Sequence, residues 1–398
     1  MEDVLLLVVI TYGVSLGFGY LLQRYLRMPW MLAALFFGIF LSLFGFFDYS
    51  IKSEPFQLLA TLGMLVILFM IGFNLDLKEM KKLGKQILAG SILRMSLEGI
   101  SGSLLLYLVF PEHVGGSYIV ALITALSFAT VGEAVLLPIL SEFKVLNTTF
   151  GQLTLGIGTF DDVIEVLMLT IIIALPAFLP GVQSQILPDP LMVVSVLGSL
   201  FILAFLMTKL GGRLKDILRK NSDMSYVNSL LVLVIFFSFA ALGGLVFEDL
   251  AAIGAILGGI VTRQSLPEEA LNENEKLINF LGYVFLSPLF FLSIGAKVSL
   301  NSLLIYPSLF ALVLIVANSP EYLTSFLLFR KTLGIKHSLL LGVGLSVRFS
   351  TSIIVQYILF NSGLISPALY STLIAAAIIM MPVIVGIYSW GITVGKTP

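Results

Sequence analysis

Three acidic residues stand close together in an otherwise apolar stretch, GIGTFDDVIEVLML, over residues 156–169. Asp161 and Asp162 are adjacent, and Glu165 lies one helical turn after Asp161, so that these two share a helix face. A carboxylate inside a membrane is costly unless it is paired, hydrated or neutralised. Burial and a like-charged neighbour both favour the protonated form of a carboxyl group. The stretch therefore indicates a site for a proton or a cation, and the adjacent pair should release its protons as a coupled set.

Charged residues inside the expected helices are mostly acidic. Six acids and two bases fall well within apolar segments: Glu98, Glu133, Asp161, Asp162, Glu165, Glu321, Arg94 and Arg348. Full pairing is impossible, so some of the acids must be protonated or must hold a cation. Arg94 and Glu98 are one turn apart and most simply neutralise each other, which still leaves an excess of acids. Acids that hold either a proton or a cation are what proton-for-metal exchange requires.

The available ligand atoms suit a hard, weakly held cation. The chain has no Cys, and its two His residues lie near expected loop edges, which argues against zinc or copper. We expect Asp161 and Asp162 to be transient ligands of a monovalent cation. Hydroxyl, carbonyl or further carboxyl oxygens at Thr130, Glu133 and Ser350 would complete the site. We expect no cofactor.

Two pairs of similar segments indicate an internal duplication. They are IGFNLDL (71–77) with IGAKVSL (294–300), and ALSFATVGEAVLLPIL (125–140) with GLSVRFSTSIIVQYIL (344–359), at nearly the same separation. The separation corresponds to an odd number of helices, which predicts two repeats of opposite orientation in the membrane. Gly, Ser and Thr concentrate near Thr130 and Ser350, in the second pair. We expect both segments to unwind there and to cross at the midplane.

The composition is that of a membrane protein. Of the 398 residues, 58% are hydrophobic and 11% are charged, against roughly 25% charged in a soluble domain. Apolar runs near the ~20 residues that cross a bilayer recur along the chain. The expected spans are about 3–22, 29–47, 55–75, 86–110, 116–140, 149–175, 191–208, 226–247, 249–263, 277–296, 302–328, 337–360 and 366–392. The predicted fold class is an all-α membrane protein of about 13 transmembrane helices, with two inverted six-helix repeats and crossing broken helices.

We expect one transmembrane transporter domain over residues 1–392 and a short tail over 393–398. Within it we place repeat 1 at about 3–175, a linker helix at about 191–208 and repeat 2 at about 226–392, with loops at 209–225 and 268–275. Of the 22 basic residues, 18 fall in loops after odd-numbered helices and beyond the last helix. Basic loops face the cytoplasm, so we expect the N-terminus outside and the C-terminus in the cytoplasm, in the inner membrane of a prokaryote.

Five segments resemble sequences of the monovalent cation:proton antiporter-2 family, over about residues 3–392. They are LFMIGFNLDLKEMKKLGKQI, ALSFATVGEAVLLPIL, GTFDDVIEV, SPLFFLSIGAKVSL and LGVGLSVRFSTSIIV, in the family's order and spacing. The aspartate pair is similar to the double-aspartate site of bacterial and archaeal sodium/proton antiporters, where potassium-exporting relatives carry Gln-Asp. The resemblance implies Asp162 as the main carrier, Asp161 as its partner and Thr130 as a neighbouring ligand. It also implies a homodimer and an elevator-type movement.

The sequence departs from that family pattern at two positions. Electrogenic members usually have a lysine in helix 11 that pairs with the first aspartate, whereas here Glu321 falls near that position. Glu133 lies in the first crossing segment, where relatives have small or hydroxyl residues. Both changes add negative charge and leave the stoichiometry, the electrogenicity and the ion open. We expect Arg348 to hold the crossing together through an acid or backbone carbonyls, and Glu165 either to pair with it or to face a water-filled cavity.

The leading interpretation is a transporter, not an enzyme, that exchanges Na⁺ for H⁺ across the bilayer and serves pH homeostasis. A K⁺/H⁺ antiporter is the close alternative, and Li⁺ is a further candidate cation. GIGTFDD also resembles the Gly-x-Gly-Asp context of intramembrane aspartyl proteases, but those enzymes place their two aspartates on different helices. A channel is disfavoured by the duplicated halves with broken helices. At a net charge of −1, no nucleic-acid partner is expected.

Overall fold

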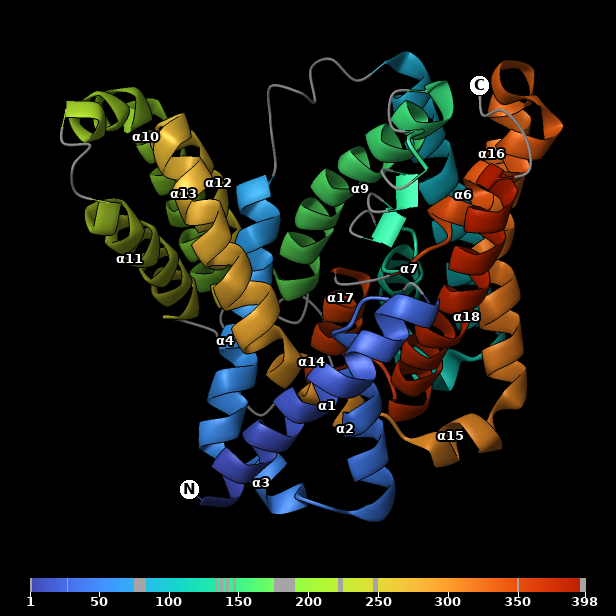
Figure 1. The fold of residues 1–398 in the computed structure, drawn as a ribbon. Helices are drawn as coiled ribbons and strands as arrows, with labels where there is room; N and C mark the ends of the chain where they lie inside the picture. The colour runs from blue at the N-terminus through green and yellow to red at the C-terminus, as the bar shows by residue number, and fades with distance from the viewer. Residues whose placement is uncertain are drawn as a thin grey trace. The chain divides into compact units, whose positions relative to one another are not determined.

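The computed structural model describes residues 2–26, 28–74, 84–132, 135–136, 139–140, 143–145, 148–174, 190–220, 225–245, 250–348 and 351–393. Every regular element in these ranges is a helix (Figure 1), which confirms the prediction of an all-helical chain. Eight of the described helices are long and apolar enough to cross a membrane, and three shorter helices are also apolar. This number agrees roughly with the thirteen spans that the sequence predicts.

The chain packs as two compact units. Unit 1 comprises Met1–Tyr12, Phe47–Leu75 and Leu169–Ser293, and unit 2 comprises Gly13–Phe46, Asp76–Met168 and Ile294–Pro398. Three helices run from one unit into the other: α1 (Glu2–Leu26), α9 (Thr149–Ala174) and α14 (Ser287–Ala296). This division into units does not test the two inverted repeats, which therefore stay a prediction.

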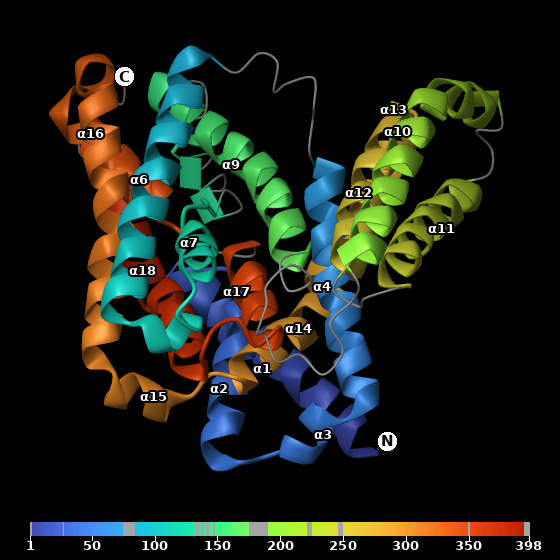
Figure 2. The same ribbon diagram turned by 180° about the vertical axis from the view of Figure 1, so that it is seen from behind.

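Unit 1 is organised around α12 (Leu250–Ser265). This helix packs against α4 (Glu54–Asn74), α10 (Pro190–Lys220) and α11 (Ser225–Gly244) (Figures 1 and 2). A Cβ atom on Gly72 would lie 2.0 Å from the carbonyl oxygen of Ile256, and one on Gly259 would lie 2.1 Å from that of Phe69. The backbones of α4 and α12 therefore touch, which is typical of membrane helices that pack through small residues.

The acidic stretch 268–275 is helical, so its prediction as a loop is wrong. It belongs to α13 (Glu268–Asn279), which continues into the π-helix η3 (Phe280–Leu286). Leu271 and Ile278 are spaced seven residues apart and are both buried, so that one face of α13 packs on its neighbours. The many charged residues of this stretch do not by themselves distinguish a helix with one buried face from a solvated loop. The predicted loop at 209–225 is wrong in the same way, because α10 extends to Lys220.

Unit 2 holds the remaining helices and a short helical turn. They are α2 (Leu32–Phe44), α6 (Lys85–Val109), η1 (Pro111–Val114), α7 (Tyr118–Leu126), α15 (Leu300–Ile305), α16 (Pro307–Leu345), α17 (Thr351–Asn361) and α18 (Pro367–Thr393), while α3 (Asp48–Lys52) belongs to unit 1. Helix α6 packs against α7 and α16, and α16 packs against α18 (Figure 2). Helix α16 joins two predicted spans, and its geometry is interrupted at Gly334, which has a φ of 76°.

The turn η1 is fastened to the residues before α18 by a buried histidine. His113 Nδ1 lies 2.7 Å from Ser366 Oγ, and the backbone N–H of Ser366 donates to the carbonyl of His113 at 3.0 Å. The ring meets Tyr306 edge to face, at 4.9 Å between centroids. Burial lowers the pKa of the His113 imidazole, and the nearby Glu112 carboxylate opposes this change. The folded protein therefore favours neutral His113.

The free energy of unfolding should decrease when the pH drops below the ordinary histidine pKa of 6.5, because His113 then has to be protonated. Because the folded-state pKa is lower than the unfolded one, the unfolded chain binds more protons in this range, and acid favours unfolding. His113→Asn should show a smaller loss of melting temperature than the wild type between pH 7.5 and 5. An equal loss in both proteins, measured by thermal unfolding in detergent, would contradict the assignment.

Gly259→Ala should destabilise the protein by about 1–3 kcal/mol, because the added methyl group overlaps the α4 backbone. Gly198→Ala is the matched control, since a Cβ on Gly198 of α10 meets no atom within 4 Å. That control should keep or slightly raise the melting temperature through its better helix propensity. If the Gly259 variant melts no lower than the Gly198 variant, the backbones of α4 and α12 are not in the close contact described.

Candidate functional site

Two helices of unit 2 are broken, and their breaks meet. Residues 127–132 follow α7 and residues 346–348 follow α16, and neither stretch is helical. The backbone N–H of Gly132 donates to the carbonyl of Val347 at 2.7 Å. The predicted crossing of two broken helices is thus confirmed within the described residues.

Hydroxyl side chains bond the backbone carbonyls next to the first break. Thr124 Oγ1 donates to the carbonyl of Val120, and Ser127 Oγ donates to that of Thr124, each at 2.7 Å. Such bonds offer the backbone carbonyls partners other than helical N–H groups. Beyond the end of α7, the carbonyl of Ser127 accepts from Ser352 Oγ of α17 at 2.7 Å. The break therefore exchanges helical hydrogen bonds for bonds between the crossing segments.

Arg348 lies in the second break, and 3% of it is exposed. Its guanidinium donates to the carbonyls of Thr130 (3.2 Å), Leu345 (2.7 Å) and Ala317 (3.3 Å) and to the carboxylates of Glu98 and Glu321 (3.0 Å each). One side chain thereby connects both breaks with α6 and α16. A planar guanidinium with five donors can bond several carbonyls and carboxylates at once, which a lysine cannot do.

Arg94 of α6 is the second buried guanidinium of the site. Its Nη1 donates to Glu321 Oε1 at 2.6 Å, and its Nη2 forms an ion pair with Asp161 of α9. The contact to Glu98, one turn along α6, is longer at 3.9 Å. Mutual neutralisation of Arg94 and Glu98 is therefore not the main pairing. Sequence spacing revealed the neighbour on the same helix, whereas the closer partners come from two other helices.

Glu321 receives both guanidiniums on a single oxygen, Oε1, from Arg94 at 2.6 Å and from Arg348 at 3.0 Å. It follows Pro320, which has no N–H to donate to the carbonyl of Val316 in the preceding turn of α16. Where the family resemblance implies a lysine as the partner of Asp161, this chain has an acid. The positive charge beside Asp161 comes instead from Arg94 of α6.

We call Arg94, Glu98, Asp161, Glu321 and Arg348 the charge cluster. Each of the five is at most 3% exposed, and they are the only buried Asp, Glu, Lys or Arg residues among those that the structure describes. Guanidiniums keep their protons in proteins, so two fixed positive charges face three carboxyl groups. Excess charge at such a place is costly unless it is neutralised or hydrogen-bonded. The cluster can therefore take up one proton or one cation.

The structure brings together some of the residues that the sequence singled out. Asp161, Glu321 and Arg348 belong to the cluster, and Thr130 joins it through its carbonyl, while its hydroxyl faces the carbonyl of Ser127 at 3.4 Å. The remaining candidates fall outside the described parts: Asp162 and Glu165 lie in α9 but their side chains are not described, and Glu133 and Ser350 are outside the described residues. A cation-binding role for these residues stays a prediction.

Arg94 and Glu98 are two residues of the cluster that the sequence alone does not identify as part of the site. The signal that could have identified them is the excess of acids over bases, because it implies that each intramembrane arginine contacts several carboxylates. Among the described residues, no three His, Cys, Asp or Glu side chains group as ligands of one metal ion. In the described state, guanidiniums occupy the positions next to the carboxylates.

The sequence of this chain is similar to those of known proteins. The family described as "Sodium/hydrogen exchanger, transmembrane" matches residues 13–390. The chain is 25% identical over 366 residues to a "Probable Na(+)/H(+) antiporter 3" of Methanocaldococcus jannaschii, covering 90% of this chain and 89% of that protein. It is 26% identical over 327 residues to an "Na(+)/H(+) antiporter" of Enterococcus hirae, covering 80% of each chain.

A solved structure shares the fold. The sodium proton antiporter MjNhaP1 of Methanocaldococcus jannaschii, solved at pH 8, superposes with a TM-score of 0.61 at 16% identity and covers 97% of both chains. At this identity the likeness concerns the fold alone.

Arg94→Met should strongly destabilise the protein, because it leaves Asp161 without its guanidinium and raises the excess of carboxyl groups from one to two. Breaking a buried ion pair from one side costs roughly 3–5 kcal/mol. Adding Glu321→Gln should restore much of the melting temperature, since the excess returns to one acid. Arg330→Met, at an exposed position of α16, is the control and should change little. A double variant no more stable than Arg94→Met would show that charge balance does not hold the cluster together.

Proposed function

Because the chain belongs to the sodium/hydrogen exchanger family, we propose that it is a secondary transporter that exchanges Na⁺ for protons across a membrane. The observation that carries this proposal is the charge cluster, where three buried carboxyl groups face two guanidiniums beside the crossing of two broken helices. Surplus acid in an apolar interior requires a proton or a cation as compensation. A group that accepts either one in turn can exchange one for the other.

We place the exchange at the Asp161–Asp162 pair of α9, as in the double-aspartate branch of the antiporter-2 family. Asp162 is the main carrier and Asp161 its partner, with Thr130, Glu133 and Ser350 as further oxygen ligands. Support comes from the position of Asp161, which lies in the cluster and is 0% exposed. The supporting charges are Glu165, Glu321 and Arg348. Carboxylate, hydroxyl and carbonyl oxygens match the preference of hard cations.

The proposed mechanism is alternating access with a movement of the elevator type. A site loaded with protons or with the cation is nearly neutral and crosses the apolar barrier, whereas the empty, charged site is held back. All the buried Asp, Glu, Lys and Arg side chains described belong to unit 2, and none belongs to unit 1. This distribution supports unit 2 as the transporting part and unit 1 as the scaffold of a homodimer. Following the basic loops, we place the N-terminus outside and the C-terminus in the cytoplasm of a prokaryotic cell.

Potassium is the second candidate cation. The positive partner of Asp161 is an arginine on α6 and not a lysine on the helix of Glu321, so the charge distribution differs from that implied by electrogenic sodium/proton antiporters. The aspartate pair and the relatives named Na⁺/H⁺ antiporters favour sodium.

Reconstituted protein should exchange H⁺ for Na⁺, and flux with Na⁺, Li⁺ and K⁺ at clamped voltage identifies the ion and the stoichiometry. Asp162→Asn should abolish exchange, because the main carrier is lost. Asp161→Asn should retain exchange with a shifted pH profile, since Arg94 loses one of its partners. Measurable exchange by the Asp162→Asn variant would refute the assignment of the carrier.

A further inference from the structure

When no cation is bound, the charge cluster needs one proton to balance its described charges. Arg94 and Arg348 remain charged at any pH that the protein experiences. If Glu98, Asp161 and Glu321 were all ionised, one negative charge would remain without compensation at a place no more than 3% exposed. A proton on one of the three carboxyl groups removes that charge. The question is which of the three carries it.

Glu98 and Asp161 each have one close guanidinium partner, whereas Glu321 has two. Arg94 donates to Asp161 and, at 2.6 Å, to Glu321, and Glu321 also receives Arg348. Glu98 has one close partner, Arg348 at 3.0 Å, which it shares with Glu321, while Arg94 stays at 3.9 Å. Each acid has a second oxygen without a hydrogen-bond partner among the described residues, so these oxygens do not separate them. The number of close guanidinium contacts sets Glu321 apart, and the surroundings of Glu98 and Asp161 separate these two.

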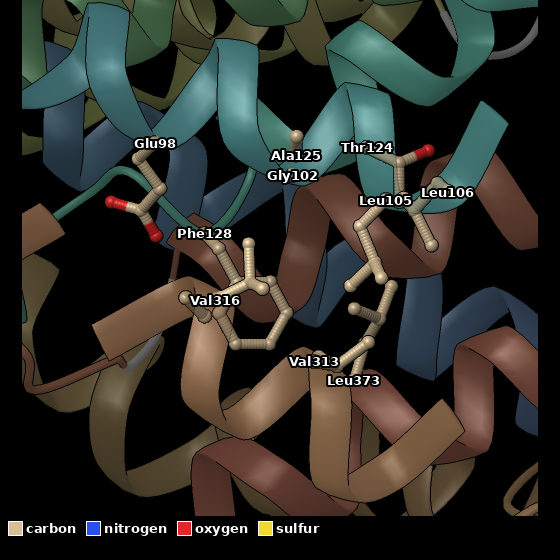
Figure 3. Close-up of a pocket in the computed structure, with 11 residues that line it drawn as sticks. Glu98, Gly102, Leu105, Leu106, Thr124, Ala125, Phe128, Val313, Val316 and Leu373 are labelled. Carbon is tan, nitrogen blue, oxygen red and sulfur yellow. The ribbon is translucent and has the colours of Figure 1, made fainter. Parts of the chain in front are cut away.

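Glu98 also has access to a cavity. It lies at one end of a space of about 30 Å³ between α6, α7 and α16, beside Phe128 and Val316, with Thr124 towards the other end (Figure 3). The lining is otherwise almost entirely apolar, and Asp161 and Glu321 are not part of it. A cavity of this size holds about one water molecule. A water molecule there would reach Glu98 and no other acid of the cluster.

From these observations we infer that Glu98 is a second proton-binding residue of the exchange cycle, coupled to the cation site through Arg94. The inference rests on the proposed function. A cation that binds at Asp161 competes with Arg94 for its carboxylate. Arg94 is one turn from Glu98 on α6, and when it moves to Glu98 it favours the ionised form. The O–H bond of Glu98 then breaks, and the proton passes to water in the cavity without any transfer of electrons.

Among the described residues, Glu321 is the acid beside Glu98, and it already receives both guanidiniums. The helix of Glu98 contributes Arg94, α16 contributes Glu321, and the second break contributes Arg348. Helix α7 and the residues after it contribute Thr124, Ala125 and Phe128, which are all uncharged. One cation enters and one proton leaves, so the net charge of the cluster and its cation is unchanged by the step.

The test is the number of protons released for each sodium ion bound by the purified protein in weakly buffered detergent solution. Glu98→Gln should release one proton fewer per bound ion than the wild type, and Glu98→Asp should restore it. Glu112→Gln, with a carboxylate that is 61% exposed on η1, is the control and should match the wild type. Equal proton release by the Glu98→Gln variant and the wild type overturns the inference.

Infrared spectroscopy of the wild-type protein tests the inference even if the Glu98→Gln variant does not fold. Addition of sodium should remove the infrared band of a protonated carboxyl group, and glutamate labelled with heavy carbon at its side-chain carboxyl should shift that band. A band that responds only to labelled aspartate would refute the role of Glu98. If the wild type exchanges no alkali cation, the proposed function fails by itself. A pH titration of the same glutamate band without sodium, compared with that of the Glu98→Gln variant, then still decides whether Glu98 holds a proton.

Discussion

The cost of placing charge in an apolar interior is the constraint on which this architecture depends. Three carboxylates and two guanidiniums lie within hydrogen-bonding range of one another because separation would leave each without compensation. Their positions fix α6, α9 and α16 together, along with the second break. The same constraint makes the cluster responsive, because one further positive charge, from a proton or from a metal ion, changes which contacts are favourable.

The broken helices and the charge cluster depend on each other. A break in the membrane leaves carbonyls without helical partners, and here Arg348 takes those of Thr130 and Leu345, together with the carbonyl of Ala317 in α16. The carbonyls in turn satisfy a guanidinium that would be costly if it stood alone. Unit 1 is built differently, with glycine contacts between backbones and no buried Asp, Glu, Lys or Arg in its described part. Close, dry packing suits a scaffold, whereas the polar crossing of unit 2 suits a site that must change its contacts.

Much of the fold could be predicted from the sequence, because a bilayer imposes a single length and a single composition on its helices. The apolar segments, and the broken helices expected near Thr130 and Ser350 and their crossing, followed from patterns in the sequence; the described part of the second break is residues 346–348. Charged stretches that were expected to be solvent-exposed loops were harder to predict. Helix α13 was missed because an amphipathic helix and a solvated loop both contain many charges, and only the burial of Leu271 and Ile278 separates them.

For the site, the sequence determined the surplus of acids and hence the need for a proton or a cation, because the count of charges inside apolar segments does not depend on how those segments pack. Only the tertiary structure decided which charges meet. Arg94 stands one turn from Glu98 along the chain, yet its closest acids come from α9 and α16. The physical reason is that a long guanidinium side chain reaches across helices, so its partners depend on how the helices are packed and not on spacing along one of them.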